Sequence, residues 1–429
     1  MFIYFLIVRI AALCGHAKAR ALVRGEEETL RRAKEGFAYR HPIWIHAASV
    51  GEFEQARPLI ERLKGLEGER IRGLEGKRPQ IVVTFFSPSG YEMRKGYDKV
   101  DGVLYLPFAT RRNAKRFIEA LQPEMAIFVK YEFWPAYLKE LKRRGIKTYS
   151  ISAIFRPTQR FFHWYGKASL RLLKCFTHIF VQDEASRRLL AEHGVHDCSV
   201  AGDTRFDRVG EVMSQQVNAV KSERLQPIQD FVAGCERVII AGSTWPKDEK
   251  LLVQYVERVN GLMYEGVNGL RGERTKLIIV PHEIDEKRLH YIFNLFKGRF
   301  VRYSTATRDS MIHADVMVMD TMGLLSSAYR YGHVAYVGGG FGVGIHNTIE
   351  AAVYGLPVIF GPHYQHFREA QGLIDAGAAR SITNYAEFEA AMDTALDNYQ
   401  AIGAKAAEYV EAEIGATEKI YNAIFEVKR

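Results

Sequence analysis

The sequence is poor in cysteine and has no hydrophobic run of the length that crosses a bilayer. Its four cysteines are scattered over 429 residues and form no Cys-x-x-Cys pair. We therefore expect neither a disulfide framework nor a zinc site, and the pattern fits a reducing cytosol. The apolar start, residues 1–13, is interrupted by Arg9 and falls short of the roughly 20 apolar residues that a spanning helix needs.

The charge balance lies on the positive side. Lys and Arg number 59 against 50 Asp and Glu, which gives a net charge of +9. A basic balance suits nucleic acid, anionic lipid or phosphorylated ligands. No RNA- or DNA-binding motif is present, so we expect no nucleic-acid partner and favour a membrane surface or a phosphorylated ligand.

Residues 1–40 join the apolar start to a basic continuation. Ala17-Lys18-Ala19 resembles a signal-peptidase site, but no positive side chain precedes the apolar run. The basic residues behind the run are Lys18, Arg20, Arg24, Arg31, Arg32 and Lys34. Positive charge on that side favours the cytoplasm. We expect 1–40 to be a short anchor on the cytoplasmic leaflet, the alternative being a first helix packed on the protein's own core.

Short β-rich runs alternate with helical patterns twice along the chain. The runs are 43–47, 81–86, 103–106, 125–129, 148–151 and 178–181, then 238–241, 277–280, 301–303, 316–319, 334–337 and 358–360. This alternation is typical of parallel sheets with right-handed crossovers. We therefore expect two doubly wound, Rossmann-like α/β domains, 41–210 and 233–404, facing a cleft. A polar linker, 211–232, separates them, and a helix at 405–429 is most simply placed across both.

The most informative motif is the glycine-rich stretch 338–350, which follows an expected strand. Five glycines in seven residues, Gly340 and Gly342 among them, let backbone approach a ligand closely. Asn347 is expected to cap a helix over 348–354, whose free N–H groups favour an anion. Neither the dinucleotide fingerprint nor a P-loop fits. Asn347-x-x-Glu350 also has capping-box spacing, so a capped turn is the alternative to a phosphate-bearing ligand.

Two loops of the first half carry candidate site residues. Glu52, in Ser49-Val50-Gly51-Glu52 after the first run, is a candidate general base, although Ser49-x-x-Glu52 is equally a capping box. Lys130 and Glu132 follow the 125–129 run and could hold a polar substrate. Alternatively, Trp134-Pro135 simply opens a helix there.

Three loops of the second half join the glycine stretch at one edge of the expected sheet. Ser243 and Thr244 follow its first run, His282 its second, and Asp320-Thr321-Met322-Gly323 a later one. Loops that converge on a rigid scaffold carry function, so we expect a ligand site. His363 and His366 lack metal-ligating neighbours, and no metal is expected.

Taken in order, these stretches resemble one family. They are Ser49-Val50-Gly51-Glu52, Tyr131-Glu132-Phe133-Trp134-Pro135, Gly242-Ser243-Thr244, Asp320-Thr321-Met322-Gly323, His346-Asn347-Thr348-Ile349-Glu350-Ala351-Ala352 and Gly361-Pro362-His363. From about residue 43 onward the sequence is similar to the 3-deoxy-D-manno-octulosonic acid (Kdo) transferases of lipopolysaccharide synthesis.

The resemblance implies a GT-B glycosyltransferase that moves Kdo from CMP-Kdo to the lipid A precursor, lipid IVA, and releases CMP. It also implies the cytoplasmic face of the inner membrane and no metal or other cofactor. Our mechanistic hypothesis is an inverting displacement at the anomeric carbon of Kdo. Glu52 takes the position of the family's proposed general base. The implied CMP contacts are Pro281, His282, Met322, Gly323, Leu324, Asn347, Thr348, Ile349 and Glu350.

Three motifs depart from the family pattern. The usual Gly-Gly-His-Asn is here Gly344-Ile345-His346-Asn347. The usual Pro-Arg-His-Pro-Glu is here Pro281-His282-Glu283-Ile284-Asp285, without the arginine, and Met-Gly-Glu is Met322-Gly323-Leu324. The rival interpretations are a UDP-sugar transferase or epimerase of the same fold, and a catalytically silent, lectin-like protein of the membrane surface.

Overall fold

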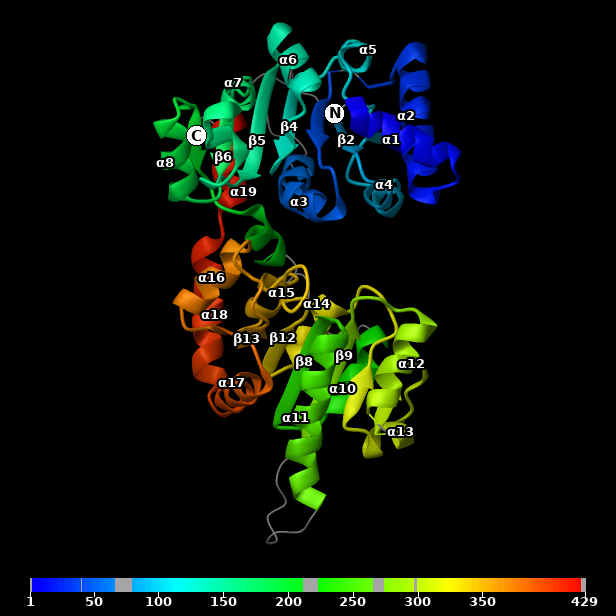
Figure 1. Ribbon diagram of the computed structural model, residues 1–429, viewed down its shortest axis with the longest axis vertical. Helices are drawn as coiled ribbons and strands as arrows, with labels where there is room; N and C mark the ends of the chain where they lie inside the picture. The colour runs from blue at the N-terminus through cyan, green and yellow to red at the C-terminus, as the bar shows by residue number, and fades with distance from the viewer. Residues whose placement is uncertain are drawn as a thin grey trace. The chain divides into compact units, whose positions relative to one another are not determined.

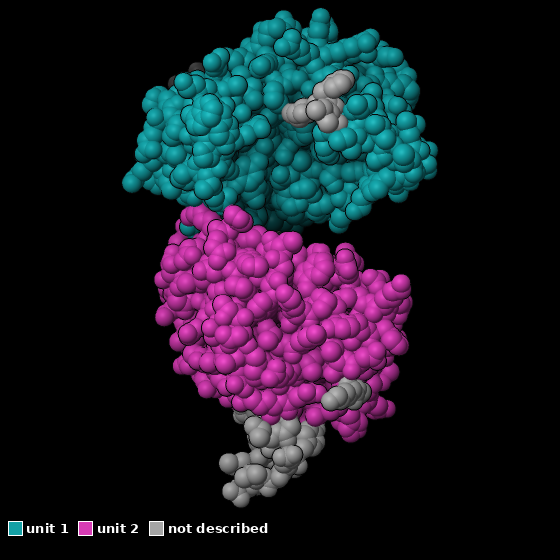
Figure 2. All heavy atoms as spheres, viewed as in Figure 1, with its two compact units in different colours: residues 1–208, 413–429 teal, residues 209–412 magenta. Residues whose placement is uncertain are grey.

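The protein folds as two compact units. The computed structural model describes residues 2–39, 41–65, 79–210, 223–264, 274–296 and 299–425. Unit 1 comprises Met1–Arg208 and Glu413–Arg429, and unit 2 comprises Val209–Ala412 (Figure 2). Most of the expected linker, 211–222, lies outside the described residues.

The sheet of unit 1 has seven parallel strands in the order β3-β2-β1-β4-β5-β6-β7. The strands are β1 Ile43–His46, β2 Ile81–Phe85, β3 Gly102–Tyr105, β4 Met125–Val129, β5 Lys147–Ala153, β6 His178–Val181 and β7 Cys198–Val200. The strand order reverses between β1 and β4, and crevices at such switch points bind ligands.

Helices cover both faces of this sheet (Figure 1). They are α1 Phe2–Leu13, α2 Ala17–Glu35, α3 Val50–Lys64, α4 Pro88–Arg94, α5 Arg111–Leu121, α6 Pro135–Arg143, α7 Lys167–Leu173, α8 Glu184–Glu192 and α19 Ala416–Phe425, with 3-10 turns η1 Arg160–Phe162 and η2 Trp164–Gly166. Ile43 and Ile45 point to the face covered by α3 and α19, and Trp44 points to the opposite face. Because both faces are buried, the strands read as continuous apolar runs.

The sheet of unit 2 also has seven parallel strands, in the order β10-β11-β9-β8-β12-β13-β14. The strands are β8 Arg237–Thr244, β9 Thr275–Pro281, β10 Phe300–Arg302, β11 Val316–Val318, β12 Val334–Val337, β13 Val358–Phe360 and β14 Ala379–Ser381. The helices are α10 Gln226–Val232, α11 Pro246–Tyr264, α12 Glu286–Leu295, α13 Arg308–His313, α14 Leu325–Ala328, α15 Ile349–Ala352, α16 Arg368–Asp375, α17 Tyr385–Asp397 and α18 Tyr399–Glu413, with 3-10 turns η3 Glu223–Leu225, η4 Tyr303–Thr305 and η5 Tyr329–Tyr331.

The C-terminal helix expected at 405–429 is two helices. α18 belongs to unit 2 and α19 to unit 1, where α19 packs against α3. Gly415 breaks the helix with φ +110°, a conformation that favours glycine. The carboxylate of Asp207 accepts bonds from the backbone N–H groups of Gly415 (2.6 Å) and Thr417 (2.7 Å). The single-helix expectation was wrong because a distant carboxylate caps the start of α19.

The N-terminal helices pack on unit 1 on one side only. Phe5 and Leu22 are buried against Tyr105 and Phe108. The outer side of α1 exposes Tyr4, Leu6, Ile7, Ile10 and Leu13. Across the described part of the chain, every helix is too short or too polar to traverse a membrane. Packing on the protein's own core is thus found, and it leaves an apolar strip on the surface.

Candidate functional site

Glu52 lies in the first turn of α3, immediately after β1. Its Oε2 accepts hydrogen bonds from the Ser49 N–H (2.8 Å) and the Ser49 hydroxyl (2.9 Å), and the Ser49 Oγ caps the Glu52 N–H. The capping box is therefore real. Within the described structure, Oε1 makes no hydrogen bond and keeps its lone pairs available. Burial raises the pKa of Glu52, and the charge of Glu132 raises it further, against the opposing effects of Ser49 and His46.

Glu132 belongs to a buried polar cluster at the ends of β1 and β4. Its Oε2 lies 3.1 Å from the His46 Nε2 and accepts from the Trp134 Nε1 at 2.5 Å. Trp134 also donates to the His46 Nε2 at 3.0 Å, and the other ring nitrogen of His46 lies 2.9 Å from the Thr84 Oγ1. Trp134 therefore does more than precede α6. Its indole N–H binds the carboxylate of Glu132, and the charge of that carboxylate raises the pKa of Glu52.

Lys130 directly follows β4 and has a left-handed conformation, with φ +61°. A non-glycine residue held there stores strain, and such residues cluster at functional sites. Its ammonium lies 6.0 Å from the centroid of the Tyr131 ring. The Tyr131 hydroxyl accepts from the Arg156 Nη1 at 3.2 Å, so two cations flank this aromatic residue.

The glycines of unit 2 differ in what surrounds them. A Cβ on Gly340 would lie 2.6 Å from the Cα of Gly361, so the backbone that approaches Gly340 closely is the protein's own. A Cβ on Gly342 would meet nothing nearer than the Gly339 carbonyl oxygen at 3.5 Å. Of the two glycines expected to admit a ligand, Gly342 has the open side.

A buried carboxylate fixes the start of this glycine loop. Asp248, in the first turn of α11, accepts through Oδ2 from the N–H groups of Gly339 (3.0 Å) and Trp245 (2.9 Å). Its Oδ1 accepts from the Tyr336 hydroxyl at 2.7 Å. Burial raises the pKa of Asp248, while these hydrogen bonds lower it. Sequence reasoning missed Asp248, whose partner Gly339 is far away in the chain.

The neighbouring Glu249 accepts a hydrogen bond from the Thr244 hydroxyl, which was expected to bind phosphate. The Thr244 Oγ1 donates to the Glu249 Oε1 at 2.8 Å, and the Arg288 Nη2 donates to the same oxygen at 2.5 Å. The hydroxyl of Thr244 is therefore engaged inside the protein. Ser243, just before it, has φ +53° and is partly exposed.

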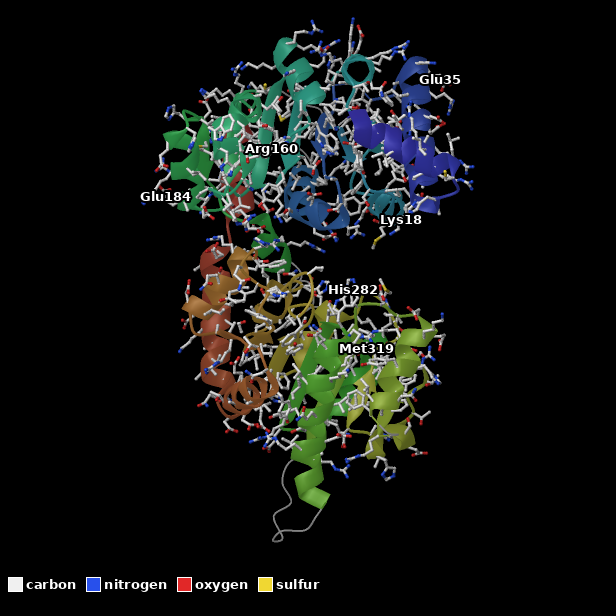
Figure 3. The ribbon with its side chains drawn as sticks, viewed as in Figure 1. Lys18, Glu35, Arg160, Glu184, His282 and Met319 are labelled. Atoms are coloured by element: carbon white, nitrogen blue, oxygen red, sulfur yellow. The ribbon has the colours of Figure 1, made fainter. Side chains whose placement is uncertain are left out.

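Three rings gather where β8 and β9 end. The His282 ring stacks on Trp245 with centroids 4.7 Å apart and lies 4.5 Å from the His346 ring (Figure 3 labels His282). The Trp245 Nε1 donates to the His346 Nε2 at 3.4 Å. Burial, and then the nearby His282, lower the pKa of His346 to about 4, so this imidazole is neutral at pH 7. Pro281 ends β9 and places His282 in this group.

The helix after the glycine loop is shorter than expected. α15 is a single turn, Ile349–Ala352, and the expected span 348–354 was wrong. The residue before α15 is Thr348, so the expected N-cap position of Asn347 was wrong by one residue. The Asn347 side chain still bonds the first turn: its Oδ1 accepts from the Ile349 N–H at 3.1 Å, and its Nδ2 donates to the Glu350 Oε1 at 2.9 Å. Asn347 and Glu350 are therefore joined by a side-chain hydrogen bond and form no capping box. The hydroxyl of Thr348 is buried and has no partner among the atoms described.

The segment after β11, residues 320–324, has both exposed and buried side chains. Met322 is 71% exposed and Leu324 is 5% exposed, so Leu324 offers a ligand its backbone and little side chain. Gly323 has φ +80° between them. The Met322 carbonyl accepts from the Arg224 Nη2 at 3.4 Å. Asp320, at the start of the segment, is held by the Ser304 N–H at 3.0 Å.

Residues that sequence reasoning missed are therefore His46, Trp245, Asp248 and Glu249. The available signal was a polar residue inside an apolar strand for His46, and two acids in a first helical turn for Asp248 and Glu249.

Comparison with known proteins gives family and fold matches. Residues 19–208 match the family model described as 3-deoxy-D-manno-octulosonic-acid transferase (kdotransferase). A 3-deoxy-D-manno-octulosonic acid transferase of Bordetella pertussis is 26% identical over 397 residues, covering 89% of this chain and 86% of that protein. A bifunctional glycosyltransferase/methyltransferase of Fusobacterium nucleatum is 23% identical over 366 residues, 82% of this chain. The chain spans 52% of that second relative, about half its length.

One solved structure shows the shared fold. The crystal structure of UDP-GlcNAc 2-epimerase from Neisseria meningitidis bound to UDP-GlcNAc gives a TM-score of 0.64 at 14% identity. The match covers 89% of this chain and 99% of that one.

Proposed function

This chain is a homologue of the Kdo transferases and is a glycosyltransferase with the GT-B fold. We propose that it transfers Kdo from CMP-Kdo to lipid IVA. CMP is released, and the configuration at the anomeric carbon is inverted. The observation that carries the proposal is the Glu52 carboxylate, which is fixed through Oε2 and has Oε1 available.

Glu52 acts as the general base. Its Oε1 takes the proton of the acceptor hydroxyl while that oxygen attacks the anomeric carbon of Kdo. The bond from that carbon to the CMP phosphate oxygen breaks, and CMP leaves with the electron pair. A carboxylate whose pKa is raised by burial and by the charge of Glu132 is a stronger base than one at its ordinary pKa. The step uses no metal, and we expect a chelator such as EDTA to leave turnover unchanged.

Unit 2 is proposed to hold the donor nucleotide. The ring cluster of Trp245, His282 and His346 offers flat faces, and the neutral imidazole of His346, to a pyrimidine nucleotide. The open side of Gly342 leaves room for the CMP phosphate. The Gly342 N–H itself donates to the Gly339 carbonyl oxygen at 2.9 Å, and the Ile349 N–H donates to the Asn347 Oδ1 at 3.1 Å. Because the family's arginine is absent after Pro281, that loop offers the phosphate a histidine in place of a guanidinium.

Calorimetric titration with CMP and with UDP tests the donor class. We expect CMP to bind and UDP to bind at least tenfold more weakly. Tight binding of UDP without binding of CMP would assign the chain to a UDP-sugar enzyme of the same fold.

Glu350 is proposed to accept hydrogen bonds from the ribose hydroxyls. Glu350→Ala should weaken CMP binding by about 1–2 kcal/mol, since hydrogen bonds to a carboxylate are lost. Calorimetry measures the affinity, and a melting curve confirms folding. Glu350→Gln is the matched control, because its side-chain oxygen still accepts from the Asn347 Nδ2. Unchanged CMP affinity in a folded alanine variant would remove the ribose role.

The exposed strip on α1 is proposed to lie on the cytoplasmic face of the inner membrane, with the basic residues of α2, among them Lys18 (Figure 3), meeting anionic lipid. The triple change Leu6→Gln, Ile7→Gln and Ile10→Gln should move most of the protein from sedimented anionic vesicles to the supernatant. It leaves the packing of Phe5 intact.

The matched control changes two apolar residues that are exposed elsewhere on the surface. Met93→Gln with Ile414→Gln should leave sedimentation with vesicles unchanged. If the triple variant sediments with vesicles as well as the parent does, the strip is not the membrane contact.

A further inference from the structure

Unit 2 has a cavity at the edge of its sheet opposite the glycine loop. Its volume is about 550 Å³, and it is lined by α10, the turn into β8, the first residues of β9, and α13. α10 and α13 pack against each other beside it (Figure 1). β8 and β9 are eight and seven residues long, so the cavity and the proposed donor site lie on the order of 20 Å apart.

The floor of the cavity holds a buried cation. Lys276 is 6% exposed, and its ammonium donates to the carbonyl oxygens of Met311 (3.4 Å) and Ala314. It lies 4.6 Å from the centroid of the Phe231 ring. In the described residues no carboxylate lies within ion-pair distance of this ammonium. Burial lowers the pKa of Lys276, and the Cys235 thiol and the more distant charge of Asp315 oppose that shift in part. An ammonium taken out of water without a directly paired carboxylate is unfavourable, so this position favours an incoming negative charge.

Two guanidinium groups line the same cavity. Arg308, at the start of α13, makes no ion pair with any described residue, and Arg274 donates to the Ile312 carbonyl at 3.5 Å. The carboxylates of Asp230 and Glu236 also line the cavity, so its formal charge is +1 from three cations and two anions.

Apolar side chains complete the wall. Phe231, Met311 and Ile312 line the cavity, and Ile312 is 59% exposed at its rim. The lining therefore pairs a positive floor with an apolar side, which matches a ligand that has one anionic end and an apolar body.

We propose that this cavity binds a small organic oxyanion that carries an apolar chain. The oxyanion lies between Lys276 and Arg308, and the chain lies against Phe231 and Ile312. The site is separate from Glu52 and from the glycine loop, and it does not depend on the proposed Kdo transfer. A carboxylate and a phosphate monoester share this chemistry, and the probes below distinguish them.

Cys235 lines the cavity and reports on its occupancy. It is half-buried, and burial raises the pKa of its thiol. The other cysteines, Cys14, Cys175 and Cys198, all lie in unit 1. Peptide mass spectrometry after iodoacetamide treatment gives the alkylation rate of each cysteine in the intact protein.

Octyl phosphate or octanoate should slow alkylation of Cys235 at least fivefold, with saturation, and leave the unit 1 cysteines unaffected. Inorganic phosphate should protect weakly, and octanol, which has the chain without the charge, should not protect. Protection by octyl phosphate alone or by octanoate alone supports the proposal and identifies the headgroup. Absence of protection by both, or equal protection by octanol, overturns it.

Two variants test the cations. Lys276→Met keeps a long apolar side chain against Phe231, and Arg308→Ala changes an exposed position. Each variant should need at least tenfold more probe than the parent for half-protection, with protection measured against that variant's own alkylation rate without probe. Lys250 is exposed on α11, and Lys250→Met is the control. In this variant the probe should protect Cys235 as it does in the parent. If Lys276→Met fails to fold, Arg308→Ala decides, and unchanged protection in that variant overturns the proposal.

Discussion

Glu52→Gln is expected to lower turnover on the order of a hundredfold or more, because an amide cannot take the acceptor's proton at neutral pH. The glutamine oxygen can still accept from the Ser49 N–H and hydroxyl, so the capping box and the fold are kept. CMP affinity should stay within about twofold, since Glu52 lies in unit 1 and the proposed nucleotide residues lie in unit 2. Turnover and CMP binding are measured on the same preparation, and turnover within a few-fold of the parent would leave Glu52 as a cap.

Glu132→Gln shows whether Glu52 or the neighbouring Glu132 is the general base. Burial and the charge of Glu132 raise the pKa of Glu52 above its ordinary value of 4.5, and activity falls as pH drops through that raised pKa. Removing the charge of Glu132 lowers the pKa of Glu52, so the acid limb of the turnover profile should move to lower pH. A larger loss of turnover in Glu132→Gln than in Glu52→Gln, without that movement, would make Glu132 the base.

Gly340→Ala is expected to destabilise unit 2 by about 3 kcal/mol, the upper part of the range for overpacking. Its new Cβ would lie 2.6–2.8 Å from three backbone atoms of Gly361, and backbone cannot move aside as a flexible side chain does. The melting temperature should fall by several degrees, and CMP binding should weaken because the loop shifts.

Gly342→Ala is the matched control, two residues away in the same loop. Its Cβ meets only the Gly339 carbonyl oxygen at 3.5 Å, so the melting temperature should stay close to that of the parent. A fall in CMP affinity in this folded variant would show that the nucleotide approaches Gly342. Equal melting temperatures for Gly340→Ala and the parent would contradict the packing account.

Most of the fold could be predicted because its strands are buried on both faces. Every expected apolar run overlaps a strand, and β4, β6, β12 and β13 match to the residue. β7 and β14 were missed because they are three-residue edge strands with half-exposed side chains, and they leave no apolar run to detect. The doubly wound pattern of each unit was confirmed.

The local chemistry of the site could be predicted in part. The Ser49–Glu52 capping box and the hydrogen bond from the Ile349 N–H to the Asn347 side chain join residues three or fewer positions apart, and both are present. The contacts of His46 with Glu132 and of Asp248 with Gly339 join residues 86 and 91 positions apart. Single-sequence patterns hold no information on such pairs, because the topology of the sheet brings them together.

The central claim is tested most directly by CMP release from CMP-Kdo in the presence and absence of lipid IVA. The parent should release one CMP for each Kdo that appears on lipid IVA, and little CMP without the acceptor. Glu52→Gln should lower this release on the order of a hundredfold. Absence of acceptor-dependent CMP release from a folded protein that binds CMP would contradict the account.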